Sequence, residues 1–303
     1  DDHTPTGGTL LKISKDGSKS EIFATGFRHP IGLGMSPDGK ISGADQEGNW
    51  MPVTRLDMYK KGGFYGDMRT HHRAEPPKIY DEPLLWLPKE ADNSAGGQVW
   101  VPKGQWGVLG GKMLHLSYGR CKAYAILPDG DRFQAGAVDL GLKFLSGSAR
   151  GRFSPIDKNL YVVGLDGWQT GAQKDGSLQR VRYTGKPFTT PTAFSVHANG
   201  VNVTFDQPLD AKSVADLSNF KIGRCNYRWS ADYGSKNWSV LDPKKEGIDN
   251  VQVTAATLSE DRKTLSLKFD VQPAMHMKIE YDLKGMGEAK LKGAIYTTIR
   301  AEK

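Results

Sequence analysis

Arginine, acidic and amide side chains gather in short loops in the first 185 residues of this 303-residue chain. Arg28 and His29 stand directly before a proline, and a guanidinium can hold two oxygens of an anionic group while it keeps its charge. Asp45 and Glu47, in Asp45-Gln-Glu-Gly-Asn, carry the oxygen ligands that Ca²⁺ prefers, without the EF-hand spacing. The sequence allows two interpretations of the acidic loop: a calcium site, or a polar loop closed by its own hydrogen bonds.

Two further loops carry polar groups beside small or aromatic residues. Asp92, Asn93 and Ser94 precede two glycines, which would let a sugar or a cofactor approach the backbone, although a tight turn between strands explains them equally well. Trp168 and Gln169 interrupt a strand-like run, with Lys174 shortly after them. We expect Trp168 to be exposed, so that its face could stack on a sugar ring or a planar quinone.

Arg150 and Arg152 alternate with a glycine, so both side chains share one face of a predicted strand. The two guanidinium groups could clamp an anionic ligand together, or they could form a charged rim. His115 lies among apolar residues, and this setting predicts a hydrogen-bonded core histidine instead of a metal ligand.

The composition excludes several classes of protein. The chain has 41 Lys and Arg against 34 Asp and Glu, and the excess of +7 is spread along the sequence, so no basic stripe predicts nucleic-acid binding. The spacing of Cys121 and Cys225 matches neither a zinc-binding motif nor a haem-attachment motif. The sequence allows a disulfide between them but does not require one. No apolar run approaches the roughly 18 residues of a membrane helix, and no signal segment opens the chain. Because the chain begins at Asp1, we expect a processed or trimmed piece of a longer soluble protein.

Most segments before residue 186 are predicted to be short strands. Alternating runs such as Thr9-Leu-Leu-Lys-Ile and Leu160-Tyr-Val-Val-Gly are separated by Asp-Gly turns, and amphipathic helical patterns are almost absent. Such spacing indicates an all-β repeat architecture, of which a β-propeller is the favoured member. At about 40–50 residues per blade, residues 1–185 would supply three to four blades.

The pattern changes after a Pro- and Thr-rich joint at 184–192. Segments such as 200–205, 265–269 and 277–281 alternate in the manner of half-buried strands, and about seven strands over 186–303 predict an immunoglobulin-like β-sandwich. Residues 208–216 are predicted to add one helical turn in this part. The predicted fold is therefore all-β, a partial β-propeller followed by an immunoglobulin-like sandwich.

A longer combination of motifs resembles the soluble quinoprotein glucose/sorbosone dehydrogenases. It consists of Gly26-Phe-Arg-His-Pro, the turn Ser36-Pro-Asp-Gly, Asp45-Gln-Glu-Gly-Asn-Trp and Gly62-Gly-Phe-Tyr-Gly. A secreted bacterial branch, labelled membrane-bound dehydrogenases and often joined to a c-type haem domain, resembles the chain almost end to end. That match is carried by Trp86-Leu-Pro, Asp92-Asn-Ser-Ala-Gly-Gly-Gln-Val-Trp, His115-Leu-Ser-Tyr-Gly, Gly164-Leu-Asp-Gly-Trp-Gln-Thr, Asn226-Tyr-Arg-Trp and Tyr233-Gly-Ser.

The resemblance implies a cofactor and a site. Arg28 matches the arginine that holds pyrroloquinoline quinone in that family, and His29 replaces the asparagine beside it, with an imidazole that can still donate a hydrogen bond. Ca²⁺ is implied at Asp45 and Glu47. The residues expected to hold the cofactor are Arg28, His29, Arg150, Arg152, Trp168, Gln169 and Lys174, and those expected to hold the substrate are Asp92, Asn93 and Ser94.

The resemblance also implies an activity and a location. A sugar or polyol would be oxidised in the periplasm or outside the cell, and its electrons would pass to a c-type cytochrome or a soluble acceptor. The first half of the propeller, with the catalytic base, would lie upstream of this chain. Two alternatives stay open: a non-catalytic carbohydrate-binding or scaffolding module, and a hydrolase or lyase that uses channel carboxylates.

Overall fold

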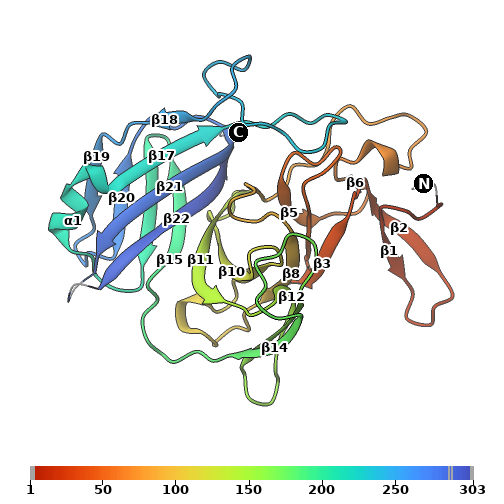
Figure 1. Ribbon diagram of the computed structural model, residues 1–303, viewed down its shortest axis with the longest axis horizontal. Helices are drawn as coiled ribbons and strands as arrows, with labels where there is room; N and C mark the ends of the chain where they lie inside the picture. The colour runs from red at the N-terminus through yellow and green to blue at the C-terminus, as the bar shows by residue number, and fades with distance from the viewer. Residues whose placement is uncertain (1–3, 286, 288, 301–303) are drawn as a thin grey trace.

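The structure, a computed structural model, describes residues 4–285, 287 and 289–300, and its regular structure is almost entirely β (Figure 1). The first part of the chain forms four sheet segments in succession, of which the third belongs to a larger, eight-stranded sheet. The first sheet holds β1 (Thr9–Ile13), β2 (Ser20–Thr25) and β6 (Gly63–Phe64), and the second holds β3 (Pro30–Met35), β4 (Ile41–Asp45), β5 (Thr54–Tyr59) and β7 (Leu85–Leu87). The third holds β8 (Ala95–Trp100), β9 (Met113–Ser117), β10 (Lys122–Pro128) and β11 (Ala135–Lys143), and the fourth holds β12 (Gly147–Phe153), β13 (Leu160–Leu165) and β14 (Gly176–Val181).

These sheets are propeller blades whose first strands lie beside one another. Strand β8 contacts β3 on one side and β12 on the other, so the three strands form the inner wall of the arc. The 3-10 turns η1 (Met68–Thr70) and η2 (Gly107–Leu109) lie in the connections. The prediction of three to four blades agrees with this arrangement, and helix is as scarce as expected.

The Asp-Gly turns close the hairpins as their sequences predict. In the β3–β4 turn, Gly39 has a φ of +82°, which glycine adopts without steric cost, and the Ser36 hydroxyl accepts the Lys40 N–H at 2.8 Å. In the β1–β2 turn, Gly17 has a φ of +74°, and the Asp16 carboxylate accepts the backbone N–H of Ser18 at 3.2 Å. The same local chemistry therefore ends both blade strands.

The C-terminal part is a sandwich of two four-stranded sheets. One sheet is ordered β15-β16-β20-β19 and the other β18-β17-β21-β22. In sequence order this is the ABED and C′CFG arrangement of immunoglobulin-like sandwiches, as predicted. The strands are β15 (Pro191–His197), β16 (Gly200–Phe205), β17 (Phe220–Cys225), β18 (Asp249–Val251), β19 (Ala255–Leu258), β20 (Thr264–Lys268), β21 (Ala274–Lys284) and β22 (Lys290–Ile299). A short helix, α1 (Ala211–Ala215), and the turn η3 (Leu217–Asn219) occupy the predicted helical position, and Asp210 caps α1 by accepting the Ser213 N–H at 2.8 Å.

The two parts of the chain share a sheet, which the sequence did not indicate. Strand β22 of the sandwich pairs with β11 of the third blade, through partners such as Ala137 and Tyr296, and joins the two into one eight-stranded sheet. Val138 and Ile295 are fully buried in one hydrophobic cluster that spans both parts. The Pro- and Thr-rich joint does lie between β14 and β15, but the packing continues across it.

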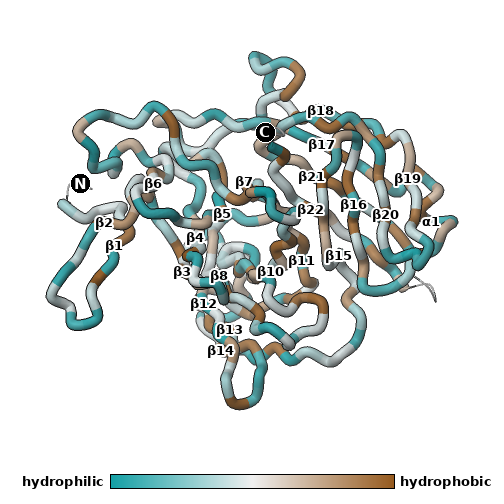
Figure 2. The backbone as a smooth tube through the Cα atoms, turned by 180° about the vertical axis from the view of Figure 1, so that it is seen from behind, coloured by the Kyte–Doolittle hydropathy of each residue, from teal (hydrophilic) through white to brown (hydrophobic). Residues whose placement is uncertain are grey.

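Buried and exposed positions follow the alternation of the strands. Figure 2 shows teal, hydrophilic residues along most connecting loops, while many of the brown, hydrophobic stretches lie in the strands. Cys121 and Cys225 are buried free thiols, so no disulfide links them. Within the described residues, no helix has the length and apolar character needed to cross a membrane.

Candidate active site at the mouth of the propeller

Loops at one end of the inner strands enclose a cavity of about 580 Å³, which we call the mouth cavity. Its walls come from six separate segments, just before β3 and β8 and just after β4, β7, β13 and β17. The lining residues are Arg28, His29, Gln46, Glu47, Lys89, Asn93, Ser94, Trp168, Gln169 and Tyr233. Six of the residues predicted to bind a cofactor or substrate therefore meet in one place.

Arg28 keeps its charge available to a ligand. Its Nη1 donates to the backbone carbonyl of Glu47 at 3.0 Å, and its guanidinium carbon lies 5.2 Å from the centre of the Tyr233 ring. No carboxylate forms an ion pair with it in the part of the chain that the structure describes. Gly48 makes this position possible, because a Cβ there would overlap the Nε and Cζ of Arg28. The side chain is thus placed by backbone and aromatic contacts and has no neutralising partner.

Asp45 is a buried anchor for the loops that carry Arg28 and His29. Its carboxylate accepts the backbone N–H of Arg28 at 2.7 Å, that of His29 at 2.9 Å and that of Gln46 at 2.9 Å. Burial raises the pKa of Asp45 to about 6, although these three hydrogen bonds oppose the shift. All three donors belong to residues that line the mouth cavity. The buried Asp45 carboxylate therefore holds the backbone of these residues in place.

The described residues contain no set of ligands for calcium at the predicted site. The Asp45 oxygens already accept backbone hydrogen bonds, and the Glu47 carboxylate pairs with Lys89 at 3.2 Å. In residues 4–285, 287 and 289–300, no three His, Cys, Asp or Glu side chains gather as a metal ion would require. The alternative for this loop, a polar turn closed by its own hydrogen bonds, describes Asp45 correctly.

Asp92 has the same anchoring role beneath the second loop, and it does not reach the cavity as a substrate ligand. It is fully buried, and its carboxylate contacts His115 Nε2 at 2.6 Å and accepts the Ser117 hydroxyl at 2.6 Å. It also accepts the backbone N–H of Ser94 at 3.2 Å. His115 is a satisfied core histidine, as the sequence indicated, because Gln98 contacts its other ring nitrogen at 3.2 Å.

Asn93 and Ser94, in contrast, do face the cavity and tie its walls together. The Ser94 hydroxyl donates to the Gln46 side chain at 2.6 Å, and the Asn93 amide donates to the Gln169 carbonyl at 3.1 Å. The Oδ1 of Asn93 is buried and has no hydrogen-bond partner within the described residues. That oxygen packs against Gly119, where an added Cβ would overlap it, so it faces the protein interior and not the cavity.

Trp168 is 84% exposed, as predicted, and stands on the rim of the mouth cavity beside Gln169. Gln169 has a φ of +53°, the left-handed conformation that lets the loop after β13 turn back sharply. Lys174 lies farther along the same loop, is exposed and does not line this cavity. The structure therefore separates Lys174 from the predicted cofactor site.

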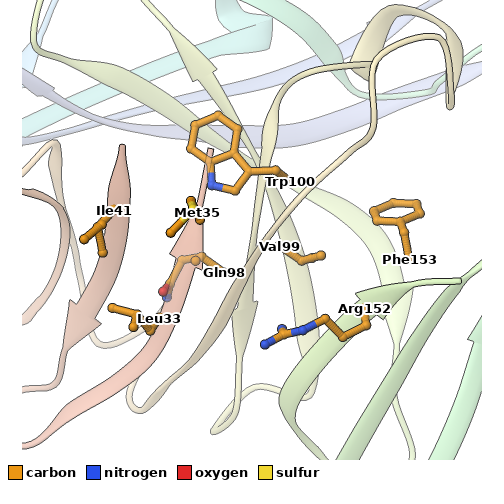
Figure 3. A pocket seen from close by; sticks show the side chains of 9 residues that line it. Leu33, Met35, Ile41, Gln98, Val99, Trp100, Arg152 and Phe153 are labelled. Atoms are coloured by element: carbon orange, nitrogen blue, oxygen red, sulfur yellow. The ribbon is translucent and has the colours of Figure 1, made fainter. Parts of the chain in front are cut away.

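Arg150 and Arg152 lie deeper, along the inner strands. Arg150 lines a neighbouring cavity of about 630 Å³ that shares His29, Ser94 and Trp168 with the mouth cavity. Arg152 points into a channel cavity of about 430 Å³ between β3, β8 and β12, where Gln98 and Leu33 face it (Figure 3). Both arginines also line a third cavity, so they share the channel-facing side of β12 as predicted.

Sequence reasoning missed three lining residues. Gln46 lies inside the acidic loop and was passed over for its charged neighbours, and Lys89 carries no motif. Tyr233 comes from the sandwich, far away in sequence, and its loop is held on the propeller by hydrogen bonds from Gly234 N–H to the Gly48 carbonyl at 3.0 Å and from Trp50 N–H to the Ser230 carbonyl at 3.0 Å. Its only signal was the Tyr233-Gly-Ser motif.

Comparisons with known proteins find similarity to solved structures only. No family model and no curated protein matches the chain. It is similar to the PQQ-bound aldose sugar dehydrogenase of Streptomyces coelicolor, at 18% identity and a TM-score of 0.41 over 57% of this chain and 51% of that one. It is also similar to the apo form of the soluble aldose sugar dehydrogenase of Escherichia coli, at 17% identity and a TM-score of 0.40 over 58% and 55%. A glucose dehydrogenase matches at 16% identity and a TM-score of 0.43 over 58% and 54%. The chain spans about half the length of these structures.

Proposed function

We propose that this chain belongs to a quinoprotein-type dehydrogenase that oxidises a sugar or polyol in its mouth cavity. The observation that carries the proposal is the meeting of an unpaired arginine, hydrogen-bonding amides and exposed aromatic rings in one cavity, from segments far apart in sequence. These are the groups needed to hold an anionic planar cofactor and a hydroxylated substrate together.

The residues fit pyrroloquinoline quinone by their chemistry. Arg28 lies in the mouth cavity and Arg150 in the cavity that adjoins it, and neither forms an ion pair within the described residues. Guanidinium groups suit the carboxylates and quinone oxygens of this cofactor because each presents a rigid pair of donors. When bound, the quinone would take the electrons of the oxidised carbon, which no protein side chain can do.

The chain's own residues would bind and orient the reactants. Arg28 and Arg150 would hold anionic oxygens, and His29, which lines both cavities, would donate a hydrogen bond beside them. Trp168 and Tyr233, which both line the mouth cavity, would cover the faces of a sugar ring. We assign no catalytic base among these residues, and the resemblance puts it on an upstream blade.

Further blades and an electron acceptor belong to the same proposal. Strands β13 and β14 leave Val163, Leu165 and Leu178 between 45% and 67% exposed on one face of the fourth sheet, where a propeller would pack its next blade. We propose that upstream blades complete the ring there, and that a c-type cytochrome or a soluble acceptor receives the electrons outside the cytoplasm. Among the described residues no set of side chains could hold calcium.

A non-catalytic carbohydrate-binding module is the second candidate. The two exposed aromatic rings on the rim, Trp168 and Tyr233, at 84% and 64% exposure, favour it, because such rings bind sugars without any redox chemistry. Sugar binding without quinone binding would support this candidate.

The test is a titration of the chain with pyrroloquinoline quinone, followed by quinone absorbance and tryptophan fluorescence. We expect saturable uptake, and we expect Arg28→Ala to weaken it at least tenfold, because a charged hydrogen-bonding contact is lost. Arg180→Ala, at an exposed position on β14, is the matched control and should bind like the parent chain. Absence of uptake by the parent chain, or equal uptake by Arg28→Ala, would contradict the cofactor assignment.

A further inference from the structure

A further cavity lies where the propeller meets the sandwich. It has a volume of about 560 Å³, and we call it the junction cavity. The loop after β7 forms one wall, strands β17, β18 and β21 form another, and residues 235–237 close it. In Figure 1 the cyan segment that follows β17 runs from the sandwich toward the propeller above this region.

Two buried polar side chains on its wall have unused hydrogen-bonding groups. His276 and Tyr227 are 5% and 6% exposed. Within the described residues His276 Nδ1 has no hydrogen-bond partner, and the Tyr227 hydroxyl has none beyond a weak interaction with the Cys225 thiol. Their ring centres lie 6.3 Å apart, and both residues line the junction cavity. Buried polar groups usually have partners, so this pair points to a ligand that supplies them.

The protonation state of His276 narrows the chemistry of that ligand. Burial lowers the pKa of His276 to about 3, with the Lys278 charge adding to the shift, so the ring is neutral near neutral pH. A neutral imidazole and a phenol each offer both a donor and an acceptor. Hydroxyl groups match this pattern because they also donate and accept, whereas a phosphate or a carboxylate needs donors only.

The charged residues around the cavity already neutralise one another. Lys278 contacts Glu90 at 3.0 Å and Glu280 at 3.1 Å, and Lys236 contacts Glu246 at 2.7 Å. Lys221 stands opposite Glu280 in the pairing of β17 with β21. The rim therefore presents balanced charge, which favours an uncharged polar ligand over an ion.

The junction cavity and the mouth cavity share one ion pair. Glu47 and Lys89, 3.2 Å apart, line both cavities and form the boundary between them. A ligand that extends past this pair would therefore enter both cavities. We propose that the junction cavity is a subsite for a further unit of a neutral oligosaccharide whose end occupies the mouth cavity, an inference that rests on the proposed function for the substrate class.

The experiment measures saccharide affinity against chain length by calorimetry, without quinone. The probes are glucose, maltotriose, cellotriose and xylotriose. For at least one series we expect the trisaccharide to bind about tenfold more tightly than the single sugar. Tyr227→Phe and Asn250→Ala should each remove most of that gain and leave single-sugar affinity unchanged, while Tyr161→Phe, at a half-buried position on β13 that lines neither cavity, should keep it.

Thermal unfolding of each variant shows whether the fold is retained, and Tyr227→Phe should fold normally because its hydroxyl loses only a weak interaction with the Cys225 thiol. Equal affinity for one unit and three units in every series, or an undiminished gain in both junction variants, would overturn the proposal. A chain-length gain in a protein that takes up no quinone would support the subsite and refute only the redox assignment.

Discussion

Two arginines of the same blade stand in opposite settings. Arg55 on β5 is 1% exposed, and it donates to both carboxylate oxygens of Asp57 at 2.7 Å and to the backbone carbonyls of Tyr65 and Asp81. Arg28, at the mouth cavity, has one backbone acceptor and one aromatic contact. The difference teaches how to separate a structural arginine from a ligand-binding one: the first has its donors satisfied within the protein, whereas the second has donors to spare.

Aromatic packing strengthens the contrast. The Arg55 guanidinium lies over three rings, those of Tyr65, Tyr80 and Trp86, at 5.3 to 5.5 Å from their centres. The guanidinium is shielded from solvent. Burial raises the pKa of Asp57, because the desolvation of its carboxylate outweighs the opposing effect of the Arg55 charge. The Arg55 region therefore stabilises the blade, and the Arg28 region is open to a ligand.

The largest expected effect is on stability and tests this division directly. Arg55→Met should lower the free energy of unfolding by about 3–5 kcal/mol, because it leaves the Asp57 carboxylate buried without a partner. Arg28→Ala should change it by no more than about 1 kcal/mol, since it breaks no ion pair within the described residues. Urea unfolding followed by tryptophan fluorescence measures both. Equal losses in the two variants would remove the distinction between the two arginines.

Much of the fold could be predicted because it depends on patterns formed by neighbouring residues in the sequence. The Asp-Gly turns and the alternating strands depend on residues close in sequence. The pairing of β11 with β22 could not be predicted, because it joins strands more than 150 residues apart and leaves no local mark.

The candidate site was predictable only in part, for a related reason. Arg28 and His29 were found through the resemblance of Gly26-Phe-Arg-His-Pro to a family motif, and Asn93, Ser94 and Trp168 were found from the composition of their loops. The roles of Asp45 and Asp92 were misjudged, since a carboxylate at a strand end can turn toward a ligand or beneath the loop, and only the surrounding backbone decides between them. The Arg55–Asp57 pair had an unused signal, because residues two apart on a strand share a face.

Asp45 connects the two arginine regions and supplies the second test. It is the cross-strand partner of Arg55 and accepts the N–H groups of Arg28 and His29. Because burial raises its pKa from 3.8 to about 6, the folded state holds a proton that the unfolded state has lost between about pH 4 and 6. The stabilising contribution of Asp45 is therefore complete below pH 4 and falls as the pH rises to about 6.

Asp45→Asn lacks this titration, so its stability relative to the parent chain should change with pH. We expect the free energy of unfolding of the parent to fall relative to the variant by about 3 kcal/mol between pH 4 and 6.5, the equivalent of two pKa units. Urea unfolding at several pH values measures the difference, with the exposed Asp232→Asn as a control that should show none. A constant difference would mean that Asp45 ionises as freely as a surface carboxylate.

The smallest expected change in stability gives the sharpest test of how Arg28 is placed. A Cβ at Gly48 would overlap the Nε and Cζ of Arg28, which are the flexible end of a side chain, so Gly48→Ala should cost less than about 0.5 kcal/mol. The guanidinium must nevertheless move away from the Glu47 carbonyl and the Tyr233 ring. Quinone affinity should therefore fall about tenfold in a protein of unchanged stability. Gly176→Ala is the control, because its Cβ would meet nothing closer than 3.7 Å. If Gly48→Ala bound quinone like the parent chain, the position of Arg28 over Gly48 would not matter for binding, and the contrast with Arg55 would concern stability alone.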